Sequence, residues 1–477
     1  MSLTIAPATL EMAAAPAVTQ VEFRSDSGVN VQAAVLRVSP QSATFQVQDP
    51  TLVLRTSESL SDFKIVLAND VVYVGPAVVN NFVEGEALNC EVGLDEGCWR
   101  DAEFSSSVLR QDGVERKFCE FVRSWQQFYL VSNEYKVVIA DLESFFAGLR
   151  LWLERIERGI GTLSEARRTE RQNEIAHELR PRVTAAIGNM FERFEVIAER
   201  IDPEQQPVHR AFGRRVLHPY LLCAPFIHRT FVKPLGYAGD YEMMNMIVRN
   251  GLEGKTIFSK LVNAYLLDQV GPQAVRNRVD YLLTRIINET SRAAQRGKMA
   301  RIFCIACGPA WEARNFIAQS PLADHAQFHL LDFNEETLRH TGEKINEVRR
   351  LHHRRTQVTF VRNSVQNLLR GKGKANGTHY DLIYCSGLYD YLNNRIISTL
   401  NTYLYDQLAP GGLLVVGNFD PSTPVRNFIE HFLDWFLIYR DGKQLAELQP
   451  EQAPREACTV FSEHTGANIF LEARKQP

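Results

Sequence analysis

The regular alternation of apolar strands with helices after Lys298 constrains the fold of this chain more than any other feature. Five short apolar runs set this rhythm, at 301–305, 327–331, 358–361, 380–384 and 412–416. Such alternation specifies a parallel sheet with helices on both of its faces. The last two β-rich runs, at 459–461 and 468–471, flank a turn and predict an antiparallel hairpin that completes the sheet.

The length of the chain predicts several domains, because 477 residues are too many for one ordinary core. After the Ala-, Pro- and Thr-rich start, short β-branched runs separated by turn residues predict a small antiparallel barrel or sandwich. The whole is expected to be a multidomain α+β protein. Its predicted divisions are a disordered tail at 1–20, a barrel at 21–107, a helical hairpin at 108–201, a helical cap at 202–298 and a doubly wound α/β domain at 299–477.

Two long amphipathic helices are predicted in the hairpin division. Apolar residues recur every three or four positions over 138–156 and again over 175–194. Gly159 and Gly161 separate the two patterns, and Pro181 should kink the second helix. The two apolar stripes either pack on each other or meet across a homodimer. The barrel is a second surface through which a homodimer is expected.

Composition argues against several classes of partner. The formal net charge is −3 with both signs interspersed, so no strong field favours nucleic acid. No apolar run approaches the roughly 18 residues that span a bilayer, and the start lacks a signal-peptide pattern. We therefore expect a cytoplasmic protein with no transmembrane segment. Cys304 and Cys307 form a lone CxxC pair, which is read as two small core residues, and no metal site is expected.

The loop after the first strand, with the sequence ACGPAWE over 306–312, is the expected ligand loop. Open parallel sheets bind ligands at the carboxyl ends of their strands, where small residues let the backbone approach. Gly308 is the only glycine of the loop, fewer than nucleotide loops usually have. The residues of this loop expected to contact the ligand are Ala306, Cys307, Gly308, Pro309 and Glu312.

Polar residues also follow the next three strands. Asp332, beside Phe333, can accept both hydroxyls of a ribose, although an aspartate after a strand can also be only a helix cap. The third strand ends in a polar pair that either meets a base edge or forms an ordinary turn. The fourth is followed by a segment in which substrate contacts are expected. The expected ligand-contacting residues after these two strands are Asn363, Ser364, Ser386 and Gly387.

The strand rhythm, Asp332, the turn at 408–412 and the terminal hairpin together resemble class I methyltransferases, which have a Rossmann-like fold. The resemblance implies S-adenosylmethionine as the cofactor. It also implies that Arg278, on the helix before the first strand, reaches the cofactor carboxylate, unless that helix face is simply exposed. Methyl transfer is an in-line displacement, so most of the catalysis is expected from alignment and exclusion of water.

The most distinctive segment is HRTFVKPLGYAGDYEMM at 228–244. With ACGPA at 306–310 and HFLDWFLIYR at 431–440, it resembles a bacterial family of extracellular-factor, or 3-hydroxypalmitic acid methyl ester, biosynthesis proteins. The resemblance implies methylation of a fatty-acid carboxylate, giving a methyl ester signal of the quorum-sensing kind. A carboxylate is already ionised near neutral pH and needs no general base, whereas a hydroxyl or an ammonium needs one.

The cap supplies the expected substrate contacts. Basic side chains there could bind a carboxylate, and aromatic rings could wall off solvent and face the sulfonium. The alternative is a cap packed by aromatics with solvated basic residues, in which Asp240 only caps a helix. The residues expected at the reacting groups are Tyr237, Tyr389 and His228. The other expected substrate contacts are His218, Arg229, Lys233, Asp240 and Tyr241.

The predicted barrel resembles a PilZ domain in pattern more than in motif. PilZ domains bind cyclic di-GMP with an RxxxR arm and a [DN]xSxxG turn. This chain has only Arg24 near the start and Val38-Ser39-Pro40-Gln41-Ser42 at the turn. We therefore predict that the barrel does not bind cyclic di-GMP in the usual way and serves interaction or dimerisation.

Three functions remain open from the sequence. The first is a methyltransferase that esterifies a 3-hydroxy fatty acid or a related small acid. The second is a methyltransferase that acts on a protein or on another small molecule. The third is a non-catalytic signalling adaptor whose loop binds the cofactor weakly or not at all.

Overall fold

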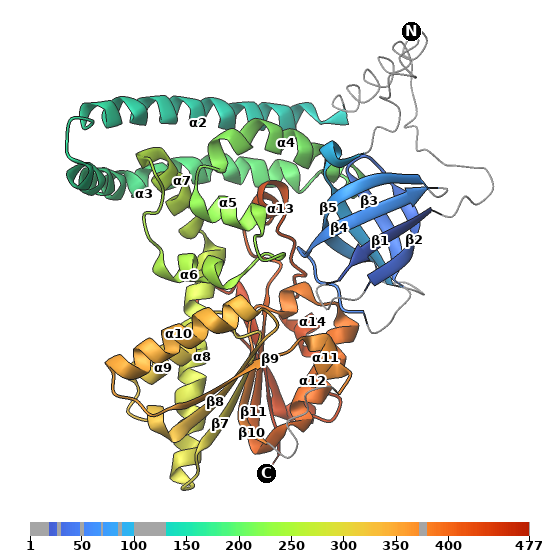
Figure 1. Cartoon of the computed structure of the whole chain (residues 1–477), viewed down its shortest axis with the longest axis vertical. Helices are drawn as coiled ribbons and strands as arrows, with labels where there is room; N and C mark the ends of the chain where they lie inside the picture. The colour runs from blue at the N-terminus through green and yellow to red at the C-terminus, as the bar shows by residue number, and fades with distance from the viewer. Residues whose placement is uncertain are drawn as a thin grey trace.

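The computed structural model describes residues 19–25, 30–47, 52–67, 70–83, 88–99, 130–371 and 379–476. Most of the predicted tail, and the first part of the predicted hairpin division up to residue 129, lie outside these ranges. Figure 1 shows a blue barrel beside a layer of helices, with the α/β domain below both.

The N-terminal unit is a closed antiparallel barrel, which confirms that prediction. Its strands follow one another around the barrel in the order β1-β2-β3-β6-β5-β4. Phe23, Phe45 and Phe63 alternate with outward-facing residues and meet in the barrel core. The strands are β1 (Thr19–Arg24), β2 (Asn30–Val38), β3 (Ser42–Val47), β4 (Ser59–Leu67), β5 (Asp70–Val83) and β6 (Leu88–Leu94). The PilZ resemblance itself stays a prediction.

The helical layer is built on a hairpin of α2 (Asn133–Gly159) and α3 (Glu165–Ala198), which lie side by side in Figure 1. The rings of Phe146 and Phe191 join them, with centroids 6.2 Å apart. The hairpin and the cap share one apolar core, so the stripes pack within a single chain. The cap helices are α4 (Gln206–Leu221), α5 (Pro225–Val232), α6 (Tyr241–Arg249) and the wholly buried α7 (Ile257–Leu267).

The C-terminal domain contains a seven-stranded sheet in the order β12-β13-β11-β10-β7-β8-β9. All neighbours among the first five strands of this domain are parallel, whereas β13 runs antiparallel between β11 and β12. This is the expected doubly wound sheet with a terminal hairpin. The strands are β7 (Ala300–Ile305), β8 (Ala326–Asp332), β9 (Gln357–Arg362), β10 (Tyr380–Cys385), β11 (Leu408–Phe419), β12 (Cys458–Ser462) and β13 (Asn468–Arg474).

Helices cover both faces of this sheet, as Figure 1 shows. In β7, Ile302 and Cys304 face one apolar core, while Phe303 and Ile305 face the other. A strand buried on both faces has to be apolar throughout, which explains the continuous runs in the sequence. One face carries α8 (Val270–Gln295), α9 (Trp311–Gln319) and α10 (Glu335–Leu351). The other face carries α11 (Val365–Leu369), α12 (Asn394–Asp406) and α14 (Gly442–Ala446). Helix α13 (Arg426–Leu433) of this domain packs in the helical layer.

The barrel is docked on the rest of the chain through the segment between β3 and β4. The backbone N–H of Thr56 donates to the carbonyl of Tyr391 at 3.2 Å, and that of Ser59 donates to the carbonyl of Gly236 at 2.7 Å. The buried Ser57 hydroxyl donates to the carbonyl of Phe436 at 2.9 Å and accepts its N–H. These bonds join the barrel to both the cap and the α/β domain. No helix within the described ranges is long and apolar enough to cross a membrane.

Replacing Ser57 with alanine should destabilise this junction. The change leaves the buried N–H and C=O of Phe436 without the hydroxyl, which costs about 1–3 kcal/mol. We expect urea unfolding to show a loss of this size. Ser61→Ala, at an exposed position of the same barrel, is the control and should change stability by less than about 0.5 kcal/mol. Equal stability of the two variants would contradict the docking role of Ser57.

Candidate functional site

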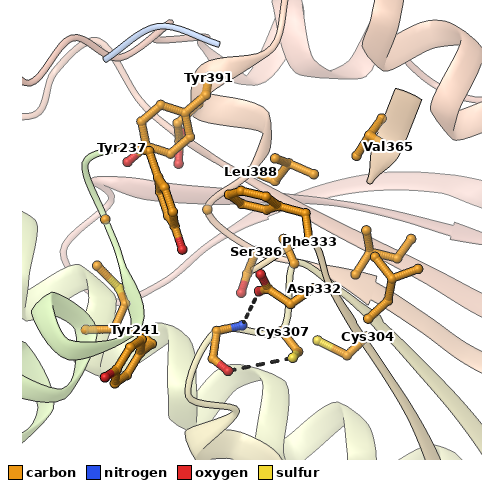
Figure 2. Close-up of a pocket in the computed structure, with 18 of the residues that line it drawn as sticks. Tyr237, Tyr241, Cys304, Cys307, Asp332, Phe333, Val365, Ser386, Leu388 and Tyr391 are labelled. Carbon is orange, nitrogen blue, oxygen red and sulfur yellow. Dashed lines mark hydrogen bonds between the residues drawn. The ribbon is translucent and has the colours of Figure 1, made fainter. Parts of the chain in front are cut away.

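A pocket of about 500 Å³ opens at the carboxyl edge of the sheet. The ends of β7, β8, β9 and β10 form its floor, while the cap, α8 and the barrel segment enclose it. Figure 2 shows Tyr237, Phe333 and Tyr391 around the space, with Asp332 and Cys307 beside them. Its volume is within the range of roughly 300–1,000 Å³ that small-molecule sites have.

The loop after β7 shapes the floor of the pocket. Ala306, Gly308 and Ala310 all have positive φ, at 52°, 50° and 47°. At Gly308 no atom lies within 4 Å of the place a Cβ would occupy, so the backbone there faces open space. The Thr341 hydroxyl donates to the Gly308 carbonyl at 2.7 Å and fixes the turn. The loop thus exposes backbone atoms to a ligand, although only one of its residues is glycine.

Asp332 joins the ends of β7 and β8. Its Oδ2 accepts the N–H of Gly308 at 3.1 Å, and its Oδ1 accepts that of Asn334 at 3.0 Å. Burial raises the pKa of Asp332, while these bonds and the charge of Arg55 lower it. The helix-cap alternative is wrong, because the side chain of Asn334 caps α10 by accepting the Thr337 N–H.

Arg278 lies at the opposite side of the pocket floor, on α8, and is only 7% exposed. Its guanidinium lies against Gly387, where an added Cβ would be 3.1 Å from Nη1. Within the described residues, its one side-chain hydrogen bond is a contact of 3.7 Å to the sulfur of Met244. Burial lowers the pKa of Arg278, while nearby Asp390 and Glu312 raise it. A buried guanidinium with so weak a hydrogen bond is suited to bind an anion.

The structure brings all the expected cofactor residues to this one pocket. They come from the ends of four strands, from the first turn of α9 and from α8. The thiols of Cys304 and Cys307 are free and buried, and both line the wall. The expected cofactor residues that line the pocket are Ala306, Cys307, Gly308, Pro309, Glu312, Asp332, Phe333, Asn363, Ser364, Ser386, Gly387 and Arg278.

Two of the expected aromatic cap residues also line the pocket. The ring of Tyr237 lies 5.1 Å from that of Phe333, centroid to centroid, and points into the space in Figure 2. The Tyr241 hydroxyl donates to Glu336 at 2.8 Å, which fixes its ring at the rim. Burial raises the pKa of Tyr237, so its hydroxyl stays protonated near neutral pH.

Tyr389 and the polar cap residues have other partners. The Tyr389 hydroxyl donates to Asn401 at 2.6 Å in the core behind the pocket. Arg229 pairs with Asp240, which also caps α6 by accepting the Met243 N–H. Buried Lys233 donates to the carbonyl of Leu433. His218, whose pKa burial lowers to about 4, bonds the Phe432 carbonyl, and His228 is exposed.

These placements correct the expected substrate site. Each of six expected residues is bonded within the cap, buried in the core or exposed to solvent. The residues that therefore do not line the pocket are Tyr389, His228, His218, Arg229, Lys233 and Asp240. The proposed site therefore omits them.

Sequence reasoning missed several residues that line the pocket. Arg55, Thr56 and Glu58 come from the barrel and lie more than 140 residues before the cap in the chain. No local pattern marks them, because their position depends on how the barrel docks. Asp390 follows the fourth strand, in the segment where substrate contacts are expected, and Trp435 lies in the distinctive segment at 431–440. In neither segment did the sequence distinguish the residue from its neighbours.

Asp390 should make stability depend on pH. Burial raises its pKa from 3.8 to about 6, although the Phe419 N–H, Arg278 and Arg440 lower it. The pKa of Asp390 is higher in the folded state than in the unfolded state, so protonation of Asp390 stabilises the folded state. This stabilisation is complete below about pH 4 and is lost as pH rises through 6. Asp390→Asn keeps an acceptor for Phe419 but cannot titrate.

The stability of Asp390→Asn relative to the wild type should therefore increase by up to about 3 kcal/mol between pH 4 and pH 7. Urea unfolding across this range measures the difference. A difference that is constant with pH would show that Asp390 does not titrate in this way.

Comparison with known proteins identifies the kind of domain that holds the pocket. No curated protein matches the sequence. Residues 236–444 match a family model described as a putative methyltransferase. This segment includes the end of the cap, α8 and β7 to β11, which supply most of the pocket.

Several solved structures are similar to this chain at low identity. A possible exported protein from Bordetella parapertussis is 16% identical, with a TM-score of 0.38, over 53% of this chain and 86% of that one. A magnesium protoporphyrin IX methyltransferase from Synechocystis PCC 6803, solved with bound SAH, is 14% identical, with a TM-score of 0.33, over 52% and 98%. An O-methyltransferase family protein from Burkholderia thailandensis is 12% identical, with a TM-score of 0.31, over 55% and 72%.

The family match supports the prediction of a methyltransferase for the segment that supplies most of the pocket.

Proposed function

We propose that this chain transfers the methyl group of S-adenosylmethionine to the carboxylate of a small acid, in first place a 3-hydroxy fatty acid. The observation that carries this proposal is the pocket at the carboxyl edge of the sheet, with Asp332 on one side of its floor and Arg278 on the other. The product is a methyl ester.

The pocket floor fits the polar groups of the cofactor. Asp332 accepts two backbone N–H groups, and a carboxylate has about four acceptor positions, so others remain for two ribose hydroxyls. Arg278 suits the cofactor carboxylate. Buried Glu312, which accepts the Tyr384 hydroxyl at 2.9 Å, suits the cofactor ammonium. When bound, the cofactor supplies a methyl group on a positively charged sulfur.

The lining of the pocket favours an acceptor that is already ionised. A carboxylate oxygen forms the new bond to the methyl carbon while the carbon–sulfur bond breaks and its electron pair stays on sulfur. No proton moves, so no general base is required. Within the described part of the chain, neither histidine nor lysine lines the pocket, and the Asp390 carboxylate that does line it accepts the Phe419 N–H. Tyr237, Tyr391 and Trp435 supply aromatic walls that exclude water.

An apolar extension of the pocket favours an acid with a hydrocarbon part. A second cavity of about 30 Å³, lined almost wholly by apolar residues, shares Val275, Phe419 and Trp435 with the main pocket. A cavity of this size holds little more than about one water molecule, so a long acyl chain would have to widen it. The cavity therefore disfavours long chains, and most of any acyl chain has to lie in the main pocket.

Methyl-deuterated S-adenosylmethionine tests the proposal directly. The protein is incubated with this cofactor and a mixture of 3-hydroxy fatty acids of different lengths, and small molecules and intact protein are analysed by mass spectrometry. We expect a deuteromethyl ester that is lost in Asp332→Ala, because that variant lacks the ribose acceptor.

The same spectra distinguish the other two functions. Label on a protein would support a protein acceptor instead. The absence of any label, together with no binding of the cofactor at millimolar concentration, would support the signalling adaptor.

Arg278→Gln should weaken binding of the cofactor product, S-adenosylhomocysteine, by about ten- to hundredfold, because a charged hydrogen bond to its carboxylate is lost. Isothermal titration calorimetry measures this affinity. Arg292→Gln is the control, because Arg292 lies on the same helix but is nearly half exposed and lies 3.8 Å from Glu289. Equal affinity of the two variants would contradict the role of Arg278.

A further inference from the structure

The barrel contributes part of the wall of the pocket. Val53, Arg55, Thr56 and Glu58, from the segment before β4, line it together with residues of the cap and of the sheet edge. Glu58 forms a backbone bridge with Tyr237. The pale blue ribbon beside Tyr391 in Figure 2 is this part of the barrel, whose Thr56 N–H bonds the Tyr391 carbonyl. The enclosure of the pocket thus requires the barrel.

Arg55 reaches over the aromatic residues of the pocket. Its guanidinium carbon lies 4.4 Å from the ring centroid of Phe333 and 5.3 Å from that of Tyr237. Glu58 fixes its direction, with the Arg55 Nε 3.5 Å from a carboxylate oxygen and the Arg55 backbone N–H 3.0 Å from it. Both side chains are largely buried, at 14% and 1% exposed. A guanidinium stacked on rings and oriented by a carboxylate is pre-organised for recognition.

The other positive charges of the pocket have different positions. Three arginines line it among the described residues. Arg362 is 64% exposed and pairs with Glu335 at the surface. Arg278 lies on the floor beside Gly387, where it suits the cofactor. Arg55 lies over Phe333 and Tyr237, where its charge also lowers the pKa of Asp332.

We propose that Arg55, supplied by the barrel, binds the carboxylate of the acceptor acid and so sets the specificity of the enzyme for acids. This inference rests on the proposed function, and it makes the barrel a part of the substrate site. The carboxylate loses its negative charge as it becomes an ester, so the attraction to Arg55 weakens toward the transition state. Arg55 therefore lowers the KM for the acid and does not raise kcat.

Binding to the protein saturated with S-adenosylhomocysteine tests the proposal, with 3-hydroxydecanoate and its neutral methyl ester as probes. Arg55→Ala should weaken binding of the acid by about ten- to hundredfold, while binding of the ester stays within about twofold. Arg55→Lys should recover part of the loss because the charge remains. Arg37→Ala, on the exposed surface of the same barrel, is the control and should bind like the wild type.

Each outcome decides between the two proposals. An equal loss for acid and ester, or no loss at all, would overturn the role of Arg55. If the wild type binds the acid through Arg55 but forms no ester from it, the role of Arg55 stands and the proposed reaction fails. If esterification proceeds with the same KM in Arg55→Ala, the reaction stands and the role of Arg55 fails.

Discussion

Burial of the central strands on both faces is the constraint on which this structure depends. Helices cover both sides of β7 and β10, so ligand chemistry has to take place at the strand ends. At the carboxyl edge, backbone N–H groups and short side chains leave the sheet together. The bond from Gly308 to Asp332 ties two of these ends to each other, and it holds a carboxylate beside bare backbone.

The rest of the pocket is built by elements that would not by themselves form one. The cap and the hairpin share a core with α13, so their position relative to the sheet is fixed by apolar packing. The barrel is held differently, through backbone bonds and the buried hydroxyl of Ser57. Such hydrogen bonds stabilise the junction only when donor and acceptor are aligned and water is excluded. They therefore fix the orientation of the barrel relative to the pocket. In this orientation of the barrel, Arg55 lines the pocket.

What could be predicted from the sequence follows from local rules. Continuous apolar runs identified the strands, and a strand end determines where the next residues lie, so residues such as Asp332 and Ser386 were found. The cap obeys no such rule. Arg229 and Lys233 carry suitable charges, but one pairs with Asp240 and the other donates to a buried carbonyl, because neighbouring helices decide which way a side chain faces. Arg55 depends on domain docking, which leaves no periodic pattern.

The charges buried around the pocket are hard to explain by stability alone. Removing an ion pair from water costs several kcal/mol per ion, and apolar residues of similar size often stabilise a protein as well or better. Arg55 with Glu58, and Arg278 near Glu312 and Asp390, nevertheless lie at the pocket and not at the surface. Binding of a ligand with charges at several points would offset the free-energy cost of burying these groups. An amino acid-bearing cofactor and an ionised acid together are such a ligand set.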